Sequence, residues 1–449
     1  MLLRQIVFRS VLCGLSLVTA DSLTAGDWPR FRGPNGSGVS TDTAPTPETW
    51  SPTENLKWKV ALPGAGVSCP IVLGNRLYVT AYSGYGDEGG DQKDLRRHLI
   101  CLDRQTGKVL WEQSVAAVLP EDPFTGMGVP QHGYASHTPT SDGERIYVFF
   151  GKSGVYAYSL DGEELWHHAV GTESDPKRWG SASSPIVVEG IVIVPAGPES
   201  RAIVGLDAAT GTERWRAPSD SLGNVWGTPA IAKVDETRTD LVIGAPYEIW
   251  GLSPQTGKLR WFCEAMETDS FNTSVVVQDG VIYAVEGRSG GSIAVRAGGL
   301  DDVTKSHVVW TGRDANRFGT PVAFEDRLYF VSGGIVNCIS AKTGEKVFQA
   351  RLPGGRAAPE RAGGPGERPG RGGGRGGTDY ASPVIADGKL YYVTNSGQTH
   401  VLKAGTKFES LAVNSLTEDA ENFAATPAIS DGELFFRSNK HLYCVSAAK

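Results

Sequence analysis

The feature that most constrains this chain is a phrase that it repeats. Most copies open with a Ser/Thr-Pro dipeptide before a β-rich run, and the clearest ones close with a small residue, Asp or Ser, Thr-Gly and Trp over eleven positions. Clear closing copies span residues 101–111, 205–215 and 251–261, and residues 338–348 keep the spacing but end in Phe348. Self-similarity at a fixed period is typical of repeat architectures. The sequence therefore predicts one repeat array rather than several unrelated domains.

The opening dipeptides give the period of the array. Their second positions are Pro70, Pro139, Pro185, Pro229, Val275, Pro321, Pro383 and Pro427. Five of the seven intervals are 44 to 46 residues long, close to the roughly 40 to 45 residues of one four-stranded propeller blade. The two longer intervals contain insertions. We therefore predict an all-β fold, an eight-bladed β-propeller of four-stranded antiparallel blades over residues 54–449.

The two ends of the array are each incomplete. The last repeat supplies three strands between residues 423 and 446, whereas residues 56–60 form a lone strand whose Trp58 resembles the closing Trp of a blade without a beginning. An unpaired strand edge exposes a row of backbone donors and acceptors. We therefore expect the N-terminal strand to close the ring as the outer strand of the last blade.

The residues before the array divide into two segments. Residues 1–20 carry Arg4 and Arg9, then an apolar run, then small residues up to Ala20, the order typical of a cleaved signal peptide. The apolar run is too short to span a membrane. Residues 21–53 are rich in turn formers, so we expect an extended segment lying across the propeller. These patterns predict a periplasmic or secreted protein with no transmembrane segment.

Charge and cysteine content exclude several classes of protein. The formal net charge of −7 becomes −9 after cleavage, because residues 1–20 hold two arginines and no acid. Nothing in this balance attracts nucleic acid. Five cysteines remain, an odd number that argues against a disulfide framework, and Cys101, Cys338 and Cys444 stand where the closing phrase has a small residue. We expect them to be buried strand residues in a monomer.

The closing phrase resembles the tryptophan-docking motif of the pyrroloquinoline quinone (PQQ) repeat family, written Ala-x-Asp-x-x-Thr-Gly-x-x-x-Trp. The resemblance covers residues 54–449 and implies that each closing Trp locks against the neighbouring blade. The implied docking residues are Trp58, Trp111, Trp166, Trp215, Trp261 and Trp310, with Phe348 and Phe408 as weaker substitutes. A buried aromatic covers about 150 to 250 Å², so these residues indicate stability rather than catalysis.

The resemblance leaves two functions open. The family that the motif resembles includes both quinoprotein dehydrogenases, which hold PQQ and Ca²⁺ over the central channel, and non-enzymatic propellers such as the assembly lipoprotein of bacterial outer membranes. The dehydrogenases carry adjacent cysteines, and this sequence has neither a Cys-Cys pair nor a Cys-x-x-Cys-His haem motif. Our first interpretation is therefore an exported binding or scaffolding module with no cofactor and no metal. The alternative is a PQQ- and Ca²⁺-dependent dehydrogenase of alcohols or sugars.

A candidate site follows from the expected architecture. Loops that lead into the innermost strands arrive on one face beside the channel mouth, and here they combine aromatics with amides, acids and arginines, as ligand pockets do. The candidates are His132, Tyr134, His137, Arg178, Trp179, Asn224, Trp226, Asp269, Asn272, Arg317, Phe318, Asp379, Tyr380, Glu421 and Asn422. We expect a protein, small-molecule or glycan ligand there. The competing interpretation is that the aromatics only plug the channel and the polar residues cap turns.

A third interpretation is a carbohydrate-active enzyme. Two facing carboxylates about 5 to 10 Å apart at the channel mouth would support it. The pair that the sequence offers is Asp269 and Asp379. No catalytic role is assigned to either residue on the first interpretation.

Residues 354–378 are rich in Gly, Arg and Pro, a composition typical of disorder. We predict that deleting this insertion leaves the melting temperature and ligand binding nearly unaltered, because such a loop contributes little packing. Differential scanning calorimetry of the deletion variant beside the full chain tests this. A large fall in melting temperature, or a loss of ligand binding, would show that the insertion is part of the folded site.

Overall fold

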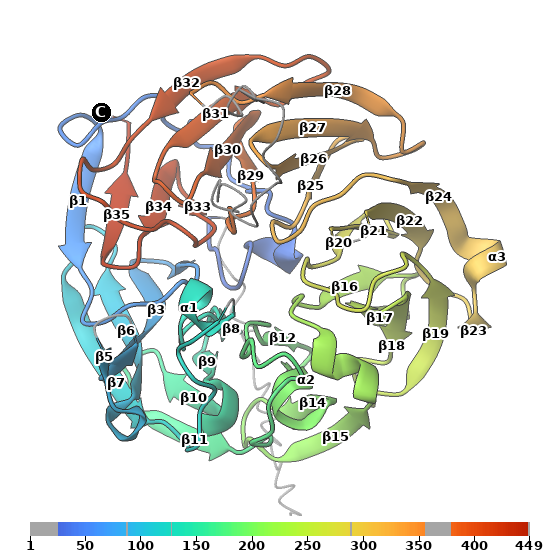
Figure 1. Cartoon of the computed structure of the whole chain (residues 1–449), viewed down its shortest axis with the longest axis horizontal. Helices are drawn as coiled ribbons and strands as arrows, with labels where there is room; N and C mark the ends of the chain where they lie inside the picture. The colour runs from blue at the N-terminus through green and yellow to red at the C-terminus, as the bar shows by residue number, and fades with distance from the viewer. Residues whose placement is uncertain (1–25, 87–88, 127, 288–289, 355–378, 448–449) are drawn as a thin grey trace, which may run out of the picture.

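The computed structural model of the chain describes residues 26–86, 89–126, 128–287, 290–354 and 379–447. The expected signal peptide and nearly all of the Gly/Arg/Pro-rich insertion lie outside the described residues. Eight antiparallel blades surround a central axis, seven of four strands and one with a fifth strand added (Figure 1). The predicted eight-bladed β-propeller is therefore confirmed.

The blades follow one another in chain order, and each begins with its innermost strand. Blade 1 consists of β2 (Ile71–Leu73), β3 (Arg76–Ser83), β6 (Arg96–Asp103) and β7 (Val109–Ala116). Blade 2 consists of β8 (Thr140–Ser141), β9 (Arg145–Phe149), β10 (Val155–Ser159) and β11 (Glu164–His168). Blade 3 consists of β12 (Ile186–Val188), β13 (Ile191–Ala196), β14 (Ala202–Asp207) and β15 (Glu213–Pro218). Blade 4 consists of β16 (Ala230–Lys233), β17 (Thr239–Ala245), β18 (Glu248–Leu252), β19 (Leu259–Glu264) and β23 (Asp301–Asp302).

The second half of the ring repeats this arrangement. Blade 5 consists of β20 (Val276–Gln278), β21 (Val281–Glu286), β22 (Gly291–Arg296) and β24 (Val308–Gly312). Blade 6 consists of β25 (Val322–Phe324), β26 (Arg327–Ser332), β27 (Ile335–Ser340) and β28 (Lys346–Arg351). Blade 7 consists of β29 (Val384–Ala386), β30 (Lys389–Val393), β31 (Thr399–Lys403) and β32 (Ser410–Asn414). Blade 8 consists of β33 (Ala428–Ser430), β34 (Glu433–Arg437), β35 (His441–Val445) and β1 (Leu56–Ala61).

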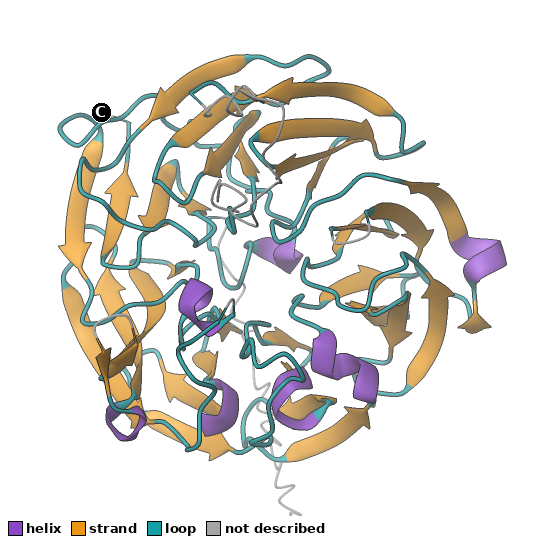
Figure 2. Ribbon diagram, viewed as in Figure 1, coloured by secondary structure: helices purple, strands orange, loops and turns teal. Residues whose placement is uncertain are grey.

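Helices are short and lie in the loops between strands (Figure 2). They are α1 (Val129–His132), α2 (Gly197–Ser200) and α3 (Thr304–His307), with single 3-10 turns η1 (Pro34–Gly36), η2 (Gln92–Asp94), η3 (Gly151–Ser153) and η4 (Asp220–Asn224). A small hairpin of β4 (Tyr85–Gly86) and β5 (Gly89–Gly90) extends the loop between β3 and β6. None of the helices in the described part of the chain has the length and hydropathy needed to span a bilayer.

Strand register explains the small residue that begins each closing phrase. Cys101 lies opposite Trp111 across the β6–β7 pair, and Gly205 lies opposite Trp215 across β14–β15. A Cβ on Gly205 would overlap the Trp215 ring, since the indole lies flat over the glycine. The small residue therefore makes room for the tryptophan of its own blade. The five described cysteines are all buried and free.

Five of the six docking tryptophans reach into the next blade in the same way. Each donates its indole N–H to a backbone carbonyl there: Trp58 to Arg104 (2.9 Å), Trp111 to Leu160 (3.0 Å), Trp166 to Ala208 (3.0 Å), Trp215 to Pro254 (3.1 Å) and Trp310 to Ala341 (2.8 Å). Each ring also covers the glycine of the next blade's tight turn, where a Cβ would overlap the indole. The turn glycine and the Trp are therefore one interlocking unit.

Blade 5 breaks this pattern. It has no Thr-Gly turn, and its equivalent segment instead forms β23, which pairs in parallel with β19 of blade 4. Trp261 therefore donates its indole N–H to the carboxylate of Asp240 (2.8 Å) within its own blade. Asp240 is fully buried and pairs with Arg238 (3.0 Å) and with Arg260. Trp261 therefore does not dock on a turn of the next blade, contrary to the prediction.

Phe408 does not occupy a docking position either. In blade 7 the residue opposite Val401, where the other blades place their aromatic, is Ala412. Phe408 precedes β32 and lies 6.3 Å, between ring centroids, from Phe348 of blade 6. The interpretation of Phe408 as a substitute docking residue is wrong, because the loop before β32 shifts the register of the closing phrase.

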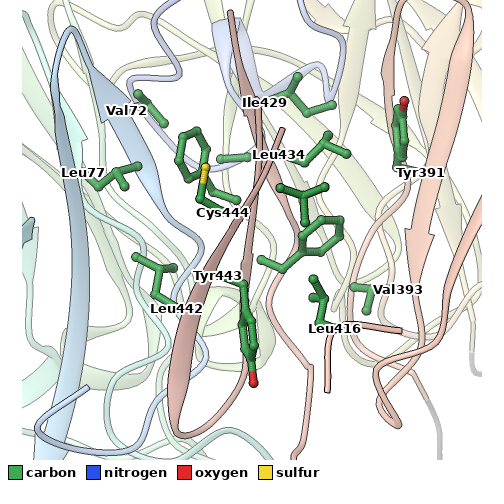
Figure 3. Packing of buried hydrophobic residues seen from close by; sticks show 14 of the residues in the cluster. Val72, Leu77, Tyr391, Val393, Leu416, Ile429, Leu434, Leu442, Tyr443 and Cys444 are labelled. Carbon is green, nitrogen blue, oxygen red and sulfur yellow. The ribbon is translucent and has the colours of Figure 1, made fainter. Parts of the chain in front are cut away.

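The ring closes through its two chain ends. β1 pairs antiparallel with β35, with Trp58 opposite Cys444 and Val60 opposite Leu442. Hydrophobic side chains of blades 7, 8 and 1 form one shared cluster around this pair (Figure 3), including Val72, Tyr391 and Leu434. The N-terminal strand therefore completes blade 8, as the sequence predicts.

A ring of hydrogen bonds joins the innermost strands of all eight blades. In blades 1 to 7 the residue before the opening Pro, or before Val275, donates its backbone N–H to the hydroxyl of the equivalent residue in the next blade. The bonds run from Cys69 to Thr138 (2.9 Å), Thr138 to Ser184 (3.0 Å), Ser184 to Thr228 (3.0 Å), Thr228 to Ser274 (2.9 Å), Ser274 to Thr320 (3.0 Å), Thr320 to Ser382 (2.9 Å) and Ser382 to Thr426 (2.9 Å). The thiol of Cys69 hydrogen-bonds with Thr426 and closes the circle. We refer to Thr138, Ser184, Thr228, Ser274, Thr320, Ser382 and Thr426 as the hydroxyl ring.

The N-terminal segment crosses the channel beneath the hydroxyl ring. The carbonyl of Pro29 accepts from Ser141 of blade 2, Arg30 donates to Pro229 in blade 4 (2.9 Å), and Arg32 reaches blades 6 and 7. Blades 2 and 6 face each other in a ring of eight, so the segment spans the axis, and the blue coil at the centre of Figure 1 is this part of the chain. The segment then packs Trp50 against Phe436 (5.6 Å between centroids) and continues into β1.

Deleting residues 54–61 should abolish a cooperative thermal transition. The deletion exposes the edge of β35 and removes the Trp58 contact with blade 1, and unpaired edges leave backbone groups unsatisfied. Calorimetry of the variant tests this against a variant with residues 26–29 deleted, which keeps β1. An unchanged melting curve for the first variant would contradict closure by β1.

Replacing Arg32 by Met should destabilise the ring by about 3 kcal/mol or more, since charge-assisted hydrogen bonds and buried unsatisfied acceptors each carry about 1 to 3 kcal/mol. The fully buried guanidinium donates to the carbonyls of Gly36, Ser37, Thr320, Pro321 and Pro383. The midpoint of urea unfolding measures the loss. Arg351→Met, at an exposed position on the outer strand β28, is the matched control and should change stability by less than about 0.5 kcal/mol. Equal midpoints for the two variants would refute the role of Arg32.

Candidate functional site

A cavity of about 440 Å³ opens at one mouth of the channel. We call it the channel cup. Each of the eight loops that lead into an innermost strand contributes to its lining, as do the hydroxyl ring and Phe31 of the N-terminal segment. Seven predicted candidates line it: His132, Trp179, Trp226, Asn272, Arg317, Phe318 and Tyr380.

The position of a residue relative to the hydroxyl ring decides whether it lines the cup. The residues two positions before the ring all line it: Val67, Ser136, Ala182, Trp226, Asn272, Phe318, Tyr380 and Ala424. The residues one position before it, such as His137 and Thr273, are buried between blades. Successive side chains of an extended chain point to opposite sides, so this alternation follows from the backbone. The opening dipeptide therefore marks the cup-lining position in every repeat.

Two aromatic pairs form opposite walls of the cup. The rings of Trp179 and Trp226 lie 5.3 Å apart between centroids, and those of Phe318 and Tyr380 lie 4.6 Å apart with an interplanar angle of 26°. Trp179 precedes blade 3 and Tyr380 precedes blade 7, which are opposite in a ring of eight. Such walls offer two flat faces to a ring-shaped group placed between them.

Hydrogen bonds hold the tryptophan wall in place. Trp226 donates its indole N–H to the carbonyl of Gly180 (2.8 Å), and the Nε2 of His132 lies 2.7 Å from the carbonyl of Trp179. A carbonyl only accepts, so Nε2 carries the proton. Burial lowers the pKa of His132, which favours the neutral imidazole. His132 therefore positions the loop and adds no charge to the cup at neutral pH.

Arg317 is the charged side chain beside the Phe318–Tyr380 wall, in the upper part of the cup above the hydroxyl ring. Its guanidinium carbon lies 4.9 Å from the centroid of the Phe318 ring, a cation–π arrangement. The side chain is exposed, and no carboxylate among the described residues forms an ion pair with it. The guanidinium therefore keeps its donors available to a molecule in the cup.

The lower wall consists of hydroxyl groups. Each ring hydroxyl accepts one backbone N–H from the preceding blade. A hydroxyl is also a donor. The hydroxyls of Thr138 and Thr426 hydrogen-bond with the Cys69 thiol, and for the other five members, Ser184 to Ser382, no described residue accepts that proton. The lower wall thus presents several O–H donors toward the axis.

Two predicted candidates lie outside the cup because they point between blades. Tyr134 is buried and donates its hydroxyl to the carbonyl of Asp122 (2.6 Å), and His137 bonds through Nε2 to Ser181 (2.8 Å). Burial lowers the pKa of His137 to about 3 and raises the pKa of the neighbouring Glu199 to about 7. These groups form a separate buried polar cluster, which holds blades 2 and 3 together.

The carboxylates suggested for carbohydrate chemistry are also outside the cup. Asp379 accepts from the hydroxyl of Tyr392 (2.9 Å) and from the backbone N–H of Asn395 (2.9 Å). Asp269 is exposed and lies 3.6 Å from Lys177. Neither carboxylate lines the cup, so the structure does not bring this pair together at a ligand.

The remaining candidates have structural contacts. Glu421 is buried and accepts from Tyr443 (2.7 Å) and His441 (2.8 Å), and Asn422 lies on the exposed loop beside Asn439 (3.0 Å). Asn224 ends η4, and its backbone carbonyl accepts the backbone N–H of Phe271 (2.9 Å). Arg178 is an exposed turn residue with a positive φ of 51°. None of these four side chains lines the cup.

The described part of the lining carries no acid. No Asp or Glu is among the described lining residues, and no group of three or more His, Cys, Asp or Glu in the described ranges could hold a metal ion. The described lining of the cup is therefore a neutral-to-cationic surface of aromatic rings, hydroxyls, two amides and one exposed guanidinium.

Sequence reasoning missed the lower half of the cup. The hydroxyl ring, Ser136 and Phe31 all line it and were absent from the predicted set. The signal for the ring was present in seven of the eight repeats, as the Ser or Thr of the opening dipeptide, but it was interpreted only as a marker of the period. For Phe31 the sequence offers no signal, because the path of the N-terminal segment depends on contacts with six blades.

The curated proteins that resemble this chain include two polyvinylalcohol dehydrogenases. The protein from Sphingopyxis sp. (strain 113P3) is 23% identical over 268 residues, which are 49% of this chain and 36% of the relative. The protein from Pseudomonas sp. is 22% identical over 330 residues, which are 58% of this chain and 47% of the relative. This chain thus spans less than half of the length of either relative.

Solved structures show the same fold at low sequence identity. BamB from Moraxella catarrhalis matches with a TM-score of 0.58 and 14% identity, covering 87% of this chain and 97% of that one. A europium-containing methanol dehydrogenase matches with a TM-score of 0.62 and 12% identity, covering 94% and 98%. Quinohemoprotein alcohol dehydrogenase from Comamonas testosteroni matches with a TM-score of 0.60 and 13% identity, covering 95% and 82%.

A family model matches the chain directly. It is described as outer membrane protein assembly factor BamB, and it matches residues 92–244 and 227–350, together more than half of the chain. The eight four-stranded blades, the interlocked tryptophans and this match agree with one another. The chain therefore belongs to the PQQ-repeat β-propeller family described as outer membrane protein assembly factor BamB.

Proposed function

We propose that this chain is an exported binding or scaffolding module that holds a ligand or partner in the channel cup. The observation that carries the proposal is the lining of the cup: two facing aromatic pairs, a ring of hydroxyls and a single exposed guanidinium on eight converging loops. Binding pockets combine aromatic walls with a few orienting polar groups in this way. The ligand is a protein, a small molecule or a glycan, and the module works as a monomer in the periplasm or outside the cell, without nucleic acid.

The match to the BamB family supports the scaffolding part of the proposal. The Moraxella catarrhalis structure is covered over 97% of its length, so this ring corresponds to nearly the whole of that protein. The rigid scaffold also suits such a role, because loops on a fixed framework commonly carry recognition.

A second candidate function is a PQQ- and Ca²⁺-dependent dehydrogenase of alcohols or sugars. The two polyvinylalcohol dehydrogenases and the methanol dehydrogenase structure favour it. Calcium in proteins takes six to eight oxygen ligands, mostly carboxylates and carbonyls, and no carboxylate is among the described residues that line this cup. The acid nearest to Asn272 is Glu286, which is buried and accepts backbone N–H groups of Asn272 (2.8 Å), Thr273 (3.1 Å) and Gly287 (2.9 Å).

These residues do not fit a calcium-bound quinone. Glu286 is used by the backbone, and Asn272 directs its amide nitrogen to that carboxylate (3.2 Å). The dehydrogenase therefore stays the second candidate, and we propose that the chain works without a cofactor.

Calcium should leave the affinity of the chain for PQQ unchanged within about threefold, because the lining residues that the structure describes include no carboxylate to bind the ion. Isothermal titration calorimetry with PQQ, with and without Ca²⁺, measures this. The same preparations should not reduce an artificial electron acceptor when given methanol or polyvinyl alcohol.

The control is a calcium-dependent quinoprotein methanol dehydrogenase treated in parallel, which must show both responses. A tightening of about tenfold or more by calcium, together with alcohol-dependent reduction of the acceptor by this chain, would overturn the binding module and establish the dehydrogenase.

A further inference from the structure

We infer that a buried pocket between blades 2 and 3 is a proton-binding site whose occupancy sets the position of the tryptophan wall, Trp179 and Trp226. The pocket is separate from the channel cup, because no described residue lines both cavities. The inference goes beyond the proposed function, since the proton site works whatever molecule the cup holds.

The pocket is a small polar cavity of about 20 Å³, which has room for about one water molecule. Gly151, at the start of η3 with a positive φ of 55°, keeps this space open. A Cβ there would lie 3.2 Å from Oε1 of Glu199 and 3.9 Å from Cε1 of His137. The polar side chains that line the cavity are Arg97, Glu121, Asp122, Tyr134, His137, Lys152, Glu173, Ser181 and Glu199.

Glu199, in α2 of blade 3, is the group that takes the proton. Its side chain is buried, and its Oε2 has no hydrogen-bond partner among the described residues. No cation in the described ranges forms an ion pair with it. A buried carboxylate charge without a partner is costly, and a proton removes that charge. Burial accordingly raises the pKa of Glu199 to about 7.

The charges around Glu199 do not replace the proton, because the nearby cations are already engaged. Arg97 pairs with Glu121 (2.6 Å), and Lys152 donates to the carbonyl of Pro120 (2.9 Å) and to Ser174 (2.9 Å). The titratable and charged groups that face Glu199 are Arg97 from blade 1, Glu121 and Asp122 from the loop after β7, His132, His137 and Lys152 from blade 2 and its entry loop, Glu173 and Asp175 from the loop before blade 3, and Arg201 after α2, which pairs with Glu173 (3.3 Å). Four of these carboxylates are buried against two buried cations, so a neutral Glu199 reduces the excess of negative charge.

Ser181 connects Glu199 to His137. Its hydroxyl lies 2.8 Å from Nε2 of His137 and hydrogen-bonds with the carboxyl of Glu199. Nδ1 of His137 is buried without a partner among the described residues, and burial lowers the pKa of this imidazole to about 3. The imidazole therefore stays neutral, and the carboxyl is the member of this chain that titrates near neutral pH.

One proton reverses both hydrogen bonds of Ser181. When Glu199 is ionised, the hydroxyl donates to the carboxylate and accepts from the Nε2–H of His137. When Glu199 takes a proton from solvent, the carboxyl donates to the hydroxyl, which donates in turn to Nε2, and the imidazole proton sits on Nδ1. A water molecule in the cavity can donate to Nδ1 in the first state and accept from it in the second.

The tryptophan wall hangs on the two residues before Ser181. The carbonyl of Gly180 accepts the indole N–H of Trp226 (2.8 Å), and the carbonyl of Trp179 lies 2.7 Å from Nε2 of His132. A Cβ on Gly180 would lie 3.3 Å from Val129, so the loop is closely packed on its other side. A shift of Ser181 is therefore passed along the backbone to both tryptophans rather than absorbed by a loose loop.

The test is fluorine NMR of the full chain labelled with fluorotryptophan, recorded across a pH series without ligand. Replacing Trp179 and Trp226 by Phe one at a time assigns their resonances. We expect both resonances to move with a common midpoint near pH 7, while the resonance of Trp111 at the rim of blade 1 stays in place. Titration of His132 would move Trp179 below the ordinary histidine pKa of 6.5, and it would do so in every variant that keeps His132.

Two variants separate the proton site from its coupling to the wall. Glu199→Gln should hold both resonances at their low-pH positions throughout the series. Ser181→Ala keeps the titrating carboxyl and removes the connection, so it should also abolish the movement near pH 7. Glu164→Gln, the same change at an exposed position on β11, is the matched control and should keep the midpoint of the unchanged chain.

The melting temperature gives an independent measure of the titration. The folded chain binds the proton of Glu199 more tightly than the unfolded chain, so the folded state loses stability as the pH rises from about 4.5 to about 7. Over this window the melting temperature of the unchanged chain should fall relative to that of Glu199→Gln, and above it the difference should be constant. Ser181→Ala should keep the fall.

Each result decides one part of the inference. Parallel melting temperatures of the unchanged chain and Glu199→Gln from pH 4.5 to 7 would refute Glu199 as the proton site. Resonances of Trp179 and Trp226 that stay still near pH 7, or that move equally in Glu199→Gln or Ser181→Ala, would refute the coupling to the wall. Neither result touches the binding module, which stands or falls by the titrations with ligand.

Discussion

The hydroxyl ring is the interaction on which the rest of the molecule depends. Each blade passes one backbone N–H to the hydroxyl of the next, from Cys69 around to Thr426, so the eight innermost strands begin at a common height and radius. The loops before them must then converge, and alternation along the backbone places every second residue toward the axis. The outer tryptophans fix the spacing of neighbouring blades at the rim. Stability at the centre and geometry of the cup therefore have the same origin.

Charge is distributed unevenly in this ring, and the distribution follows from its construction. Side chains can reach the backbone carbonyls of the opening dipeptides from the side of the hydroxyl ring opposite the cup. Arg30 and Arg32 of the N-terminal segment donate hydrogen bonds to these carbonyls. The segment that fills one end of the channel thereby brings cations to the axis of an acidic protein. The cup above it inherits their field, because the low polarity of the surroundings screens buried charge weakly.

The sequence predicted the parts of the structure that repeat. The period of the opening dipeptides and the closing Trp gave eight blades, and the unfinished last repeat predicted the place of β1. The exceptions arise where a repeat is altered. Trp261 binds Asp240 because residues 298–307 leave their own blade for blade 4, a change that no local pattern reveals. Within the site, four residues were found by their place two positions before the hydroxyl ring: Trp226, Asn272, Phe318 and Tyr380. Tyr134 and Glu421 were placed in the site wrongly. They lie farther from the ring in curved loops, where side chains do not alternate as they do along an extended chain. Phe31 and the buried arginines required long-range contacts that a single sequence does not encode in any spacing.

The pairing of β1 with β35 also sets the order in which the molecule can be completed. The two partners, residues 56–61 and 441–445, are separated by almost the entire chain, so blades 1 to 7 can form from neighbouring residues while blade 8 waits for both ends. Contacts of such long sequence separation are slow to form, since the loop that they close must first be ordered. Until then one strand edge stays open, and the Gly107 turn of blade 1 lacks the Trp58 ring that covers it. The finished propeller is therefore a single cooperative unit that is closed by one strand pair, β1 with β35. The rate at which this pair separates governs how often the ring opens.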